Sequence, residues 1–195
     1  MKICKLILQL LIPLFFVLCS EDDGTDIMKT GTLTIEGTDY SLSHGEIAVS
    51  GEITPPGDVY GHLVYLLSSD FNLTETEVQG TGQLIELHFW TLSADYIEPG
   101  TYTIFDEENP DVNTFINGFY KSLNRETNVC TNYYLGVSGT ITVVKTGSTY
   151  TLTMNILTDK YANVTMGVPP AGNPIATGIT IVCSFTGELK QKYFG

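Results

Sequence analysis

The amino-acid sequence predicts an all-β protein, built as an antiparallel β-sandwich or barrel of about nine to eleven strands. Composition is the first observation: 26 threonines, 11 tyrosines and 9 phenylalanines stand against 5 alanines. Threonine and aromatic side chains favour strands, whereas alanine is the best helix former. The second observation is that apolar and polar residues alternate over many short segments, which turns containing Gly or Pro separate. The third is the lack of a convincing 3.6-residue apolar period over any ten residues.

The first half of the chain contains six expected strand segments. Residues 32–36 and 40–42 are expected to form a hairpin with its turn at Gly37-Thr38, because a turn sequence between two alternating segments is typical of hairpins. The runs 63–67 and 84–92 are continuously apolar, which is typical of strands buried on both faces. In chain order the expected segments are 32–36, 40–42, 47–49, 63–67, 84–92 and 102–104.

The C-terminal third has the clearest pattern. Alternation over 140–144 ends at the turn Thr146-Gly147, and a second strand then returns. A long loop is expected over 159–177, before a last strand over 179–185. Before this third, Phe115–Asn124 is the one segment of the chain in which a helical turn is expected instead of a strand. The expected apolar face of the returning strand comprises Tyr150, Leu152, Met154 and Ile156.

Residues 1–18 predict a signal peptide rather than part of the fold. Lys2 and Lys5 supply positive charge before an apolar run from residue 6 to residue 18. That run is too short to span a bilayer as a helix and has the length of a signal-peptide core. Residues 19–30 are polar and predict a tether, and 31–195 predict a single β-rich domain.

The end of the apolar run, Phe16-Val17-Leu18-Cys19, resembles the lipobox of bacterial lipoproteins, in which the cysteine becomes the lipidated first residue. That family usually has Leu at the first position and a small residue before the cysteine, so Phe16 and Leu18 depart from its pattern. Relaxed lipoboxes of this kind resemble those of the Bacteroidota. The alternatives are an uncleaved signal anchor and a soluble secreted protein.

The residues after the cysteine, Ser20, Glu21, Asp22 and Asp23, resemble the acidic export signal of Bacteroidota surface lipoproteins. This resemblance implies a protein that a lipid on Cys19 holds in the outer membrane, facing the cell exterior. Segments 138–143, 150–152 and 185–189 also resemble the C-terminal strands of small Bacteroidota lipoproteins, as does Pro99–Tyr102. That second resemblance implies a β-rich surface domain and no activity.

Charge is distributed unevenly along the chain. Residues 21–111 carry 19 acidic side chains and one basic one, Lys29, whereas residues 112–195 carry six basic and three acidic side chains. An acidic first half repels nucleic acid, which is therefore not expected as a partner. The acidic half would suit divalent cations or a basic protein patch. The simpler interpretation is a solvated surface that keeps the protein soluble.

Two cysteines remain after the leader and the lipidation site, namely Cys130 and Cys183. An exported protein passes through an oxidising compartment, so a disulfide between them is expected. Such a bridge would close a loop of about 54 residues and stabilise the fold by roughly 4 kcal/mol in the chain-entropy model. The alternative is two separate buried thiols.

A weak calcium candidate lies in an acidic segment. Asp106, Glu108 and Asp111 belong to a run rich in side-chain oxygens, which calcium prefers as ligands. The spacing is not that of an EF-hand, and an acidic hairpin loop is the alternative. No other cofactor or metal is expected.

A weak ligand-binding candidate lies on one strand. Glu86, His88 and Trp90 alternate with Ile85, Leu87 and Phe89, so each set shares one face of the strand. A carboxylate and an imidazole beside an indole could hold a sugar or a peptide. The alternative is the ordinary outer face of an antiparallel strand.

Function is predicted as that of a surface-anchored binding or accessory lipoprotein, with a glycan or an outer-membrane protein as partner. The sequence has no G-x-S-x-G, H-E-x-x-H, phosphate-loop or dinucleotide motif, and no catalytic residue is assigned. The first alternative is a structural or pilus-like assembly subunit that accepts a donated strand. The second is a hydrolase of extracellular polymers, which would need two carboxylates about 5–10 Å apart in a pocket.

Overall fold

The computed structural model describes residues 30–53, 59–74, 77–105 and 112–191. None of these residues is helical, which confirms the all-β class. The described residues accordingly contain no helix that could cross a membrane. The strands are β1 (Thr30–Ile35), β2 (Thr38–Ile53), β3 (Val59–Ser68), β4 (Asn72–Leu73), β5 (Val78–Gln79), β6 (Thr81–Thr91), β7 (Gly100–Ile104), β8 (Thr114–Asn124), β9 (Val129–Thr146), β10 (Thr149–Thr165), β11 (Ala176–Glu188) and β12 (Lys190–Gln191).

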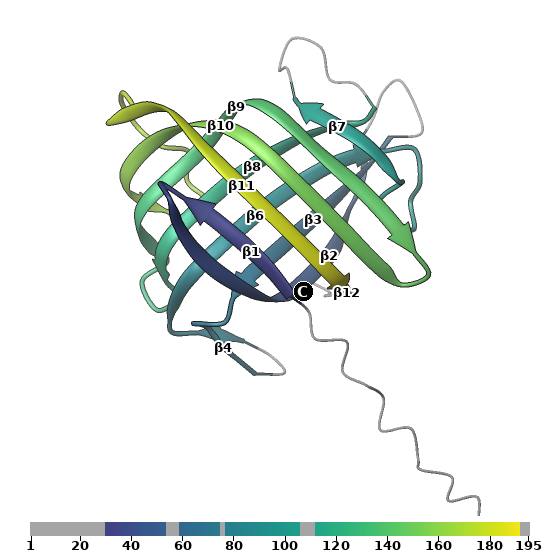
Figure 1. The fold of residues 1–195 in the computed structure, drawn as a ribbon, viewed down its shortest axis with the longest axis horizontal. Helices are drawn as coiled ribbons and strands as arrows, with labels where there is room; N and C mark the ends of the chain where they lie inside the picture. Colours follow the sequence, from purple (N-terminus) through teal and green to yellow (C-terminus); the bar gives the residue numbers. More distant parts are fainter. Residues whose placement is uncertain (1–29, 54–58, 75–76, 106–111, 192–195) are drawn as a thin grey trace, which may run out of the picture.

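The main sheet closes into a barrel because β1 pairs on both sides (Figure 1). Antiparallel pairing joins β1 to β11 on one side and to the first residues of β2 on the other. The closed order is β1-β2-β3-β6-β8-β9-β10-β11, and each of these strands is antiparallel to its neighbours in the ring. The pairing thus selects the barrel over the sandwich.

Two short strands depart from this ring. Strand β12 adds to β2 in parallel, with Lys190 opposite Glu46. Strand β7 lies between β8 and β9, parallel to the first and antiparallel to the second. Strands β8 and β9 therefore pair directly along only part of their length, from Gly118↔Leu135 to Asn124↔Val129.

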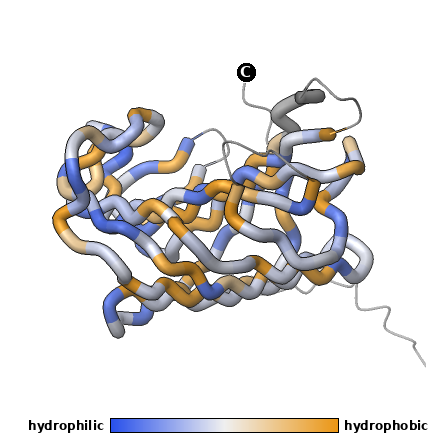
Figure 2. The backbone as a smooth tube through the Cα atoms, turned by 90° about the horizontal axis from the view of Figure 1, so that it is seen from above, coloured by the Kyte–Doolittle hydropathy of each residue, from blue (hydrophilic) through white to orange (hydrophobic). Residues whose placement is uncertain are grey.

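The barrel interior is filled by the apolar set of every ring strand. Alternation sends neighbouring side chains to opposite faces: Ile181 is fully buried, whereas Val182 is 45% exposed. Figure 2 shows the resulting alternation of hydrophobic and hydrophilic positions along the strands. The largest fully buried side chains are Tyr102, Tyr134, Phe89, Phe115, Phe119 and Phe185.

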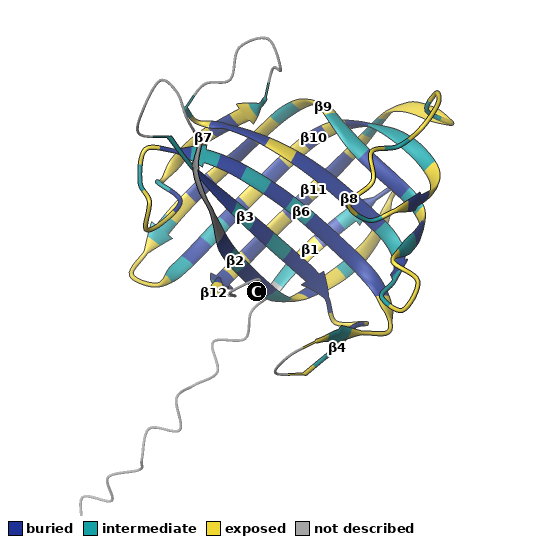
Figure 3. Cartoon of the chain, turned by 180° about the vertical axis from the view of Figure 1, so that it is seen from behind, coloured by how far each residue is buried: buried dark blue, intermediate teal, exposed yellow. Residues whose placement is uncertain are grey.

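A second apolar cluster packs on the outside of the barrel over β3, β6 and β8, which are largely buried in Figure 3. Leu67 and Leu84 face each other there, and Phe71 of the loop before β4 covers them beside Gly82. Gly118 is required because a Cβ at this position would lie 2.7 Å from the Tyr133 ring. Burial on both faces, expected for residues 63–67 and 84–92, is found at Leu66–Leu67 and Leu84–Ile85, which lie in the inner and the outer core. It does not extend along 86–92, where the outward side chains lie outside both cores and Leu92 is 55% exposed.

Two turns of the chain close the barrel ends. At one end, the β1–β2 turn carries Glu36 and Gly37, both with positive φ (51° and 77°), as a two-residue type I′ hairpin requires. At the other end, Ile97 inserts into the interior core. Nearby, the Tyr102 hydroxyl donates to the Glu98 carbonyl (2.7 Å). The His62 ring Nε2 donates to the Ser93 carbonyl (2.8 Å), and burial lowers the pKa of His62.

Two expectations about local structure are wrong. Phe115–Asn124 forms no helical turn: it belongs to β8, because its register with β6 and β9 places large side chains in both apolar clusters. The loop expected over 159–177 begins later, since β10 continues to Thr165. Tyr161 and Val164 pack with the outer cluster, which supplies the apolar contacts that extend the strand.

The expected disulfide is also wrong for this structure, in which Cys130 and Cys183 are free thiols. Cys183 lies in the interior core, opposite Leu33 and Met154 on the flanking strands. Cys130 belongs to the outer cluster, where its thiol contacts the Val164 carbonyl (3.3 Å). The two side chains therefore pack into different cores, and burial raises the pKa of each thiol.

We expect peptide mapping to find both cysteines alkylated when the protein is unfolded in denaturant without reductant. Cys183 should react slowly in the native protein, because it is fully buried and the thiolate is the nucleophile. A cross-linked peptide that contains both Cys130 and Cys183 would contradict this expectation.

Candidate functional site

The structure places Glu86, His88 and Trp90 together on the outer face of β6, as predicted. Their neighbours Ile85, Leu87 and Phe89 are fully buried in the barrel. None of the three outward residues belongs to either apolar cluster, although each is partly buried. Neither core therefore depends on His88 or Trp90.

Three rings form what we call the aromatic stack: His88, Trp90 and Phe105. The His88 and Trp90 ring centroids are 4.6 Å apart, with 23° between the planes. Phe105, just after β7, stacks on Trp90 at 4.8 Å and 23°. The backbone N–H of Phe105 donates to the Phe115 carbonyl of β8 (2.7 Å), and this bond holds the Phe105 backbone beside β8. Burial is the main cause that lowers the pKa of His88, and the proximity of His62 lowers it further.

Glu86 belongs to a different environment from the stack. It lies directly opposite Tyr65 of β3, which in turn faces Glu46 of β2. The Tyr120 hydroxyl donates to Glu86 Oε2 (3.1 Å). Burial raises the pKa of Glu86, and this hydrogen bond offsets part of the rise. Burial together with the charge of Glu86 raises the pKa of Tyr65 to about 12.

The described structure shows only a small pocket beside this row of residues. The pocket beside Glu46 and Tyr65 has a volume of about 60 Å³, which accommodates a few water molecules. Pockets that hold organic ligands are several times larger. Leu67, Leu84 and Met166 also line this pocket, so the hydrolase alternative gains no support from it.

The sheet opens beside the aromatic stack, at a place that we call the sheet fork. The register of β7 with β9 ends at Thr103↔Thr140, and that of β7 with β8 ends at Ile104↔Phe115. Direct pairing of β8 with β9 begins at Gly118↔Leu135. The sheet fork consists of the residues between these points, Ile116–Asn117 of β8 and Gly136–Gly139 of β9.

A pocket of about 420 Å³, which we call the fork pocket, adjoins this opening. Phe105 is common to the pocket wall and the aromatic stack. Its other lining residues are Thr103, Ile104, Val137, Ser138 and Gly139. Sequence reasoning missed this pocket, because it depends on where a short strand inserts between two long ones. The glycines at 136 and 139 were the available signal.

Asn117 lies at the base of the sheet fork with its amide against Gly136. The residue is 5% exposed, and neither Oδ1 nor Nδ2 has a hydrogen-bond partner in the described structure. A buried polar group without a partner costs about 1–3 kcal/mol. Asn117 lies directly opposite Leu87, so this unpartnered amide belongs to the inner face of the sheet.

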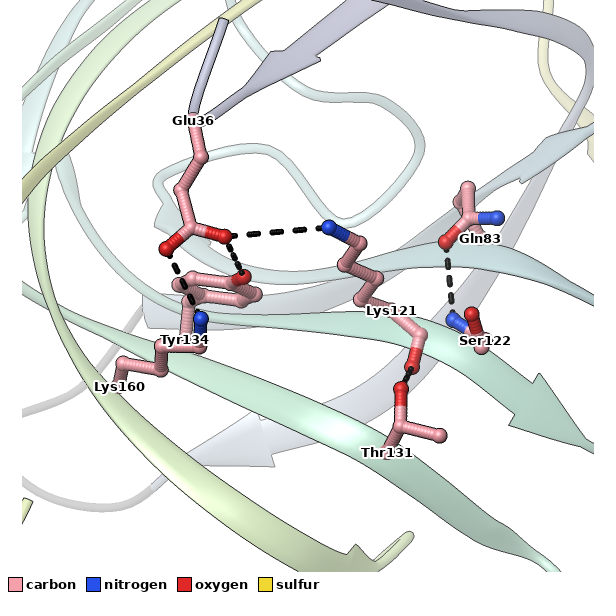
Figure 4. Close-up of polar contacts among 7 residues, drawn as sticks. All are labelled: Glu36, Gln83, Lys121, Ser122, Thr131, Tyr134 and Lys160. Atoms are coloured by element: carbon pink, nitrogen blue, oxygen red, sulfur yellow. Dashed lines mark hydrogen bonds and ion pairs between the residues drawn. The ribbon is translucent and has the colours of Figure 1, made fainter. Parts of the chain in front are cut away.

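A second polar centre, the Glu36 cluster, lies at the turn end of the barrel (Figure 4). The Glu36 carboxylate accepts hydrogen bonds from Lys160 (2.8 Å) and from the Tyr134 hydroxyl (3.0 Å), and pairs with Lys121 (3.8 Å). These partners come from β10, β9 and β8. The hydrogen bond from Lys160 is the main reason that the pKa of Glu36 is lowered. Sequence reasoning missed the cluster because its members are up to 124 positions apart.

Several predicted site residues lie outside the described residues. These are the lipidation and export residues Cys19, Ser20, Glu21, Asp22 and Asp23, and the calcium candidates Asp106, Glu108 and Asp111. Within the described ranges, no group of three or more His, Cys, Asp or Glu side chains is placed to hold a metal ion. The calcium site and the lipid anchor therefore stay predictions.

Comparison with known proteins gives no match to a family model, to a curated protein or to a solved structure.

Replacing Glu36 with Gln should lower the stability of the protein in a pH-dependent way. Because the folded-state pKa lies below the usual 4.5, the ionised carboxylate stabilises the fold above that value, and the effect is lost as pH falls through the lowered pKa. The Glu36 side chain is 35% exposed, so we expect the free energy of unfolding of the variant to be lower than that of wild type by about 1 kcal/mol or less at neutral pH. Urea unfolding at a series of pH values measures it.

Asp39→Asn is the matched control for this experiment. Asp39 lies on the same hairpin, and its carboxylate accepts a hydrogen bond from the exposed Thr34 hydroxyl (2.6 Å). We expect a smaller loss of stability than for Glu36→Gln. If the difference in free energy of unfolding between wild type and Glu36→Gln stays constant from neutral to strongly acidic pH, the Glu36 cluster does not stabilise the barrel through charge.

Proposed function

We propose that this protein is a ligand-binding lipoprotein of the outer-membrane surface, anchored through Cys19, and that the aromatic stack is its binding surface. The single observation that carries the binding role is the stack itself. Three rings pack together on the outside of a barrel whose two apolar cores do not include them. Aromatic surface outside a complete core is typical of a binding site.

The surroundings of the stack also favour binding. Ile116, directly opposite His88, is 43% exposed, and Val137 of the sheet fork is 47% exposed. These side chains extend the apolar surface from β6 towards β9. Stacked rings with apolar neighbours and a few hydroxyls suit the faces of a sugar or the side chains of a peptide.

The barrel gives less support to an assembly subunit. Strand donation needs an exposed sheet edge. Here β1 closes the ring by pairing with both β2 and β11. A binding function therefore agrees better with the observed pairing than strand exchange does.

Ligand binding should change the fluorescence of Trp90, the only tryptophan of the chain. We expect at least one member of a panel of soluble polysaccharides and unfolded peptides to shift or quench its emission in a saturable way. Trp90→Ala should abolish retention of that ligand in affinity electrophoresis, because the central ring of the stack is lost. Thermal unfolding should show that the variant remains folded.

The control is Val182→Ala, which removes an exposed apolar side chain from β11. It should leave retention unchanged. If every retained ligand binds Trp90→Ala as well as wild type, the aromatic stack is not the binding surface.

Cys19→Ala should release the protein from the membrane fraction or stall its processing. A single acyl chain gives marginal anchoring, and the lipid modification of a lipoprotein cysteine adds more than one chain, so loss of the thiol removes the anchor. Fractionation and mass analysis of the mature N-terminus measure the outcome. Membrane association of the variant with its leader fully removed would exclude lipidation as the anchor.

A further inference from the structure

We infer that the fork pocket binds one ring of an uncharged, hydroxyl-rich ligand, namely a neutral sugar unit of a glycan. This inference rests on the proposed binding function and names the ligand class of the same surface. Its elements are the backbone of the sheet fork, the lining of the pocket and the aromatic stack at the rim.

The backbone of the sheet fork offers hydrogen-bonding groups that no neighbouring strand takes up. Between the end of the β7 register and the start of the β8 register, residues Gly136–Gly139 of β9 lack a partner strand on the fork side in the described structure. Backbone N–H and C=O groups in such a position pair with water or with a bound molecule. Alternating donors and acceptors along one edge suit a ligand that carries several hydroxyl groups.

Local backbone geometry keeps this edge open. The register of β9 with β10 shifts beside Val137, as in a β-bulge, so that the edge bends. Gly139 has φ of 129°, and a side chain there would collide with the backbone of Asn155. The irregular residues are therefore the same ones that line the fork pocket.

The lining of the fork pocket selects against charged ligands. None of the six described residues that line it is ionisable, so these residues offer no counter-charge to a carboxylate, sulfate or ammonium group. The hydroxyls of Thr103 and Ser138 are the polar side-chain groups of the wall, and both residues are exposed. The acidic excess of the chain, a net charge of −13, further disfavours anions.

The size and the aromatic rim point to a ring-shaped group. About 420 Å³ lies within the range of small-molecule sites. Phe105 borders the pocket and stacks on Trp90, so a ring in the pocket would contact the end of the stack.

The test uses the full mature chain and the fluorescence of Trp90. The probes are short neutral oligomers of glucose, mannose, xylose and N-acetylglucosamine, with an oligogalacturonate as the charged counterpart. Ser138→Phe and Thr103→Phe fill the pocket from opposite walls at exposed, outward-facing positions. Thr153→Phe is the matched control, because Thr153 is an exposed outer-face residue of β10. Thermal unfolding reports whether each variant is folded.

We expect at least one neutral oligomer to change Trp90 emission in a saturable way. Ser138→Phe and Thr103→Phe should each weaken its binding about tenfold or more, and Thr153→Phe should leave it unchanged. The oligogalacturonate should bind about tenfold more weakly than the best neutral oligomer, or not at all. Two filling variants keep the test decisive if one of them unfolds.

The inference is overturned if no neutral oligomer binds, if both filling variants bind like wild type, or if the oligogalacturonate binds as tightly as the best neutral oligomer. The proposed function fails separately. A peptide whose retention depends on Trp90 but not on Ser138 would overturn the sugar pocket and leave the aromatic stack as a binding surface. If the binding of no ligand, of any class, depends on Trp90, the proposed function itself is wrong.

Discussion

Closure of the ring by β1 is the constraint on which the rest of the structure depends. This six-residue strand pairs with β11 on one side and with β2 on the other. Closure leaves one inward face for every strand, and the apolar set of each strand is fully removed from water only in a closed ring. The aromatic side chains Phe89, Phe115 and Phe185 then belong to one interior core. Without the two ladders of β1, the face that carries Leu33 and Ile35 would leave the core open along one side.

The polar groups of the barrel follow from the same closure. Ion pairs collect at the turn end, where Glu36 leaves the β1–β2 hairpin and reaches Lys121 and Lys160 on strands far away in sequence. The outer face of β3, β6 and β8 is unusual, because a second apolar cluster covers part of it. The remaining outer surface near the end of β6 holds the aromatic stack. Burial thus divides one face into a structural part and a part that is available to a ligand.

Insertion of β7 links the fold to the proposed function. A barrel of uninterrupted strands would pair all backbone groups of β8 and β9 with one another. Because β7 separates these strands and then ends, four residues of β9 lose their partner strand beside the fork pocket. The inserted strand also carries Phe105 to Trp90, so a single topological feature forms both the pocket and one end of the aromatic stack.

The sequence by itself determined the all-β class and the division of faces along β6. Alternation is a local property, so it correctly placed Ile85, Leu87 and Phe89 inside and Glu86, His88 and Trp90 outside. Tertiary structure alone decided what depends on contacts between distant segments. Phe115–Asn124 became a strand because it pairs on both sides, and β10 lengthened because Tyr161 and Val164 found the outer cluster. Cys130 and Cys183 stayed apart because their strands face different cores. The ring closure, the Glu36 cluster and the sheet fork likewise arise from registers between strands, which a single sequence does not encode locally.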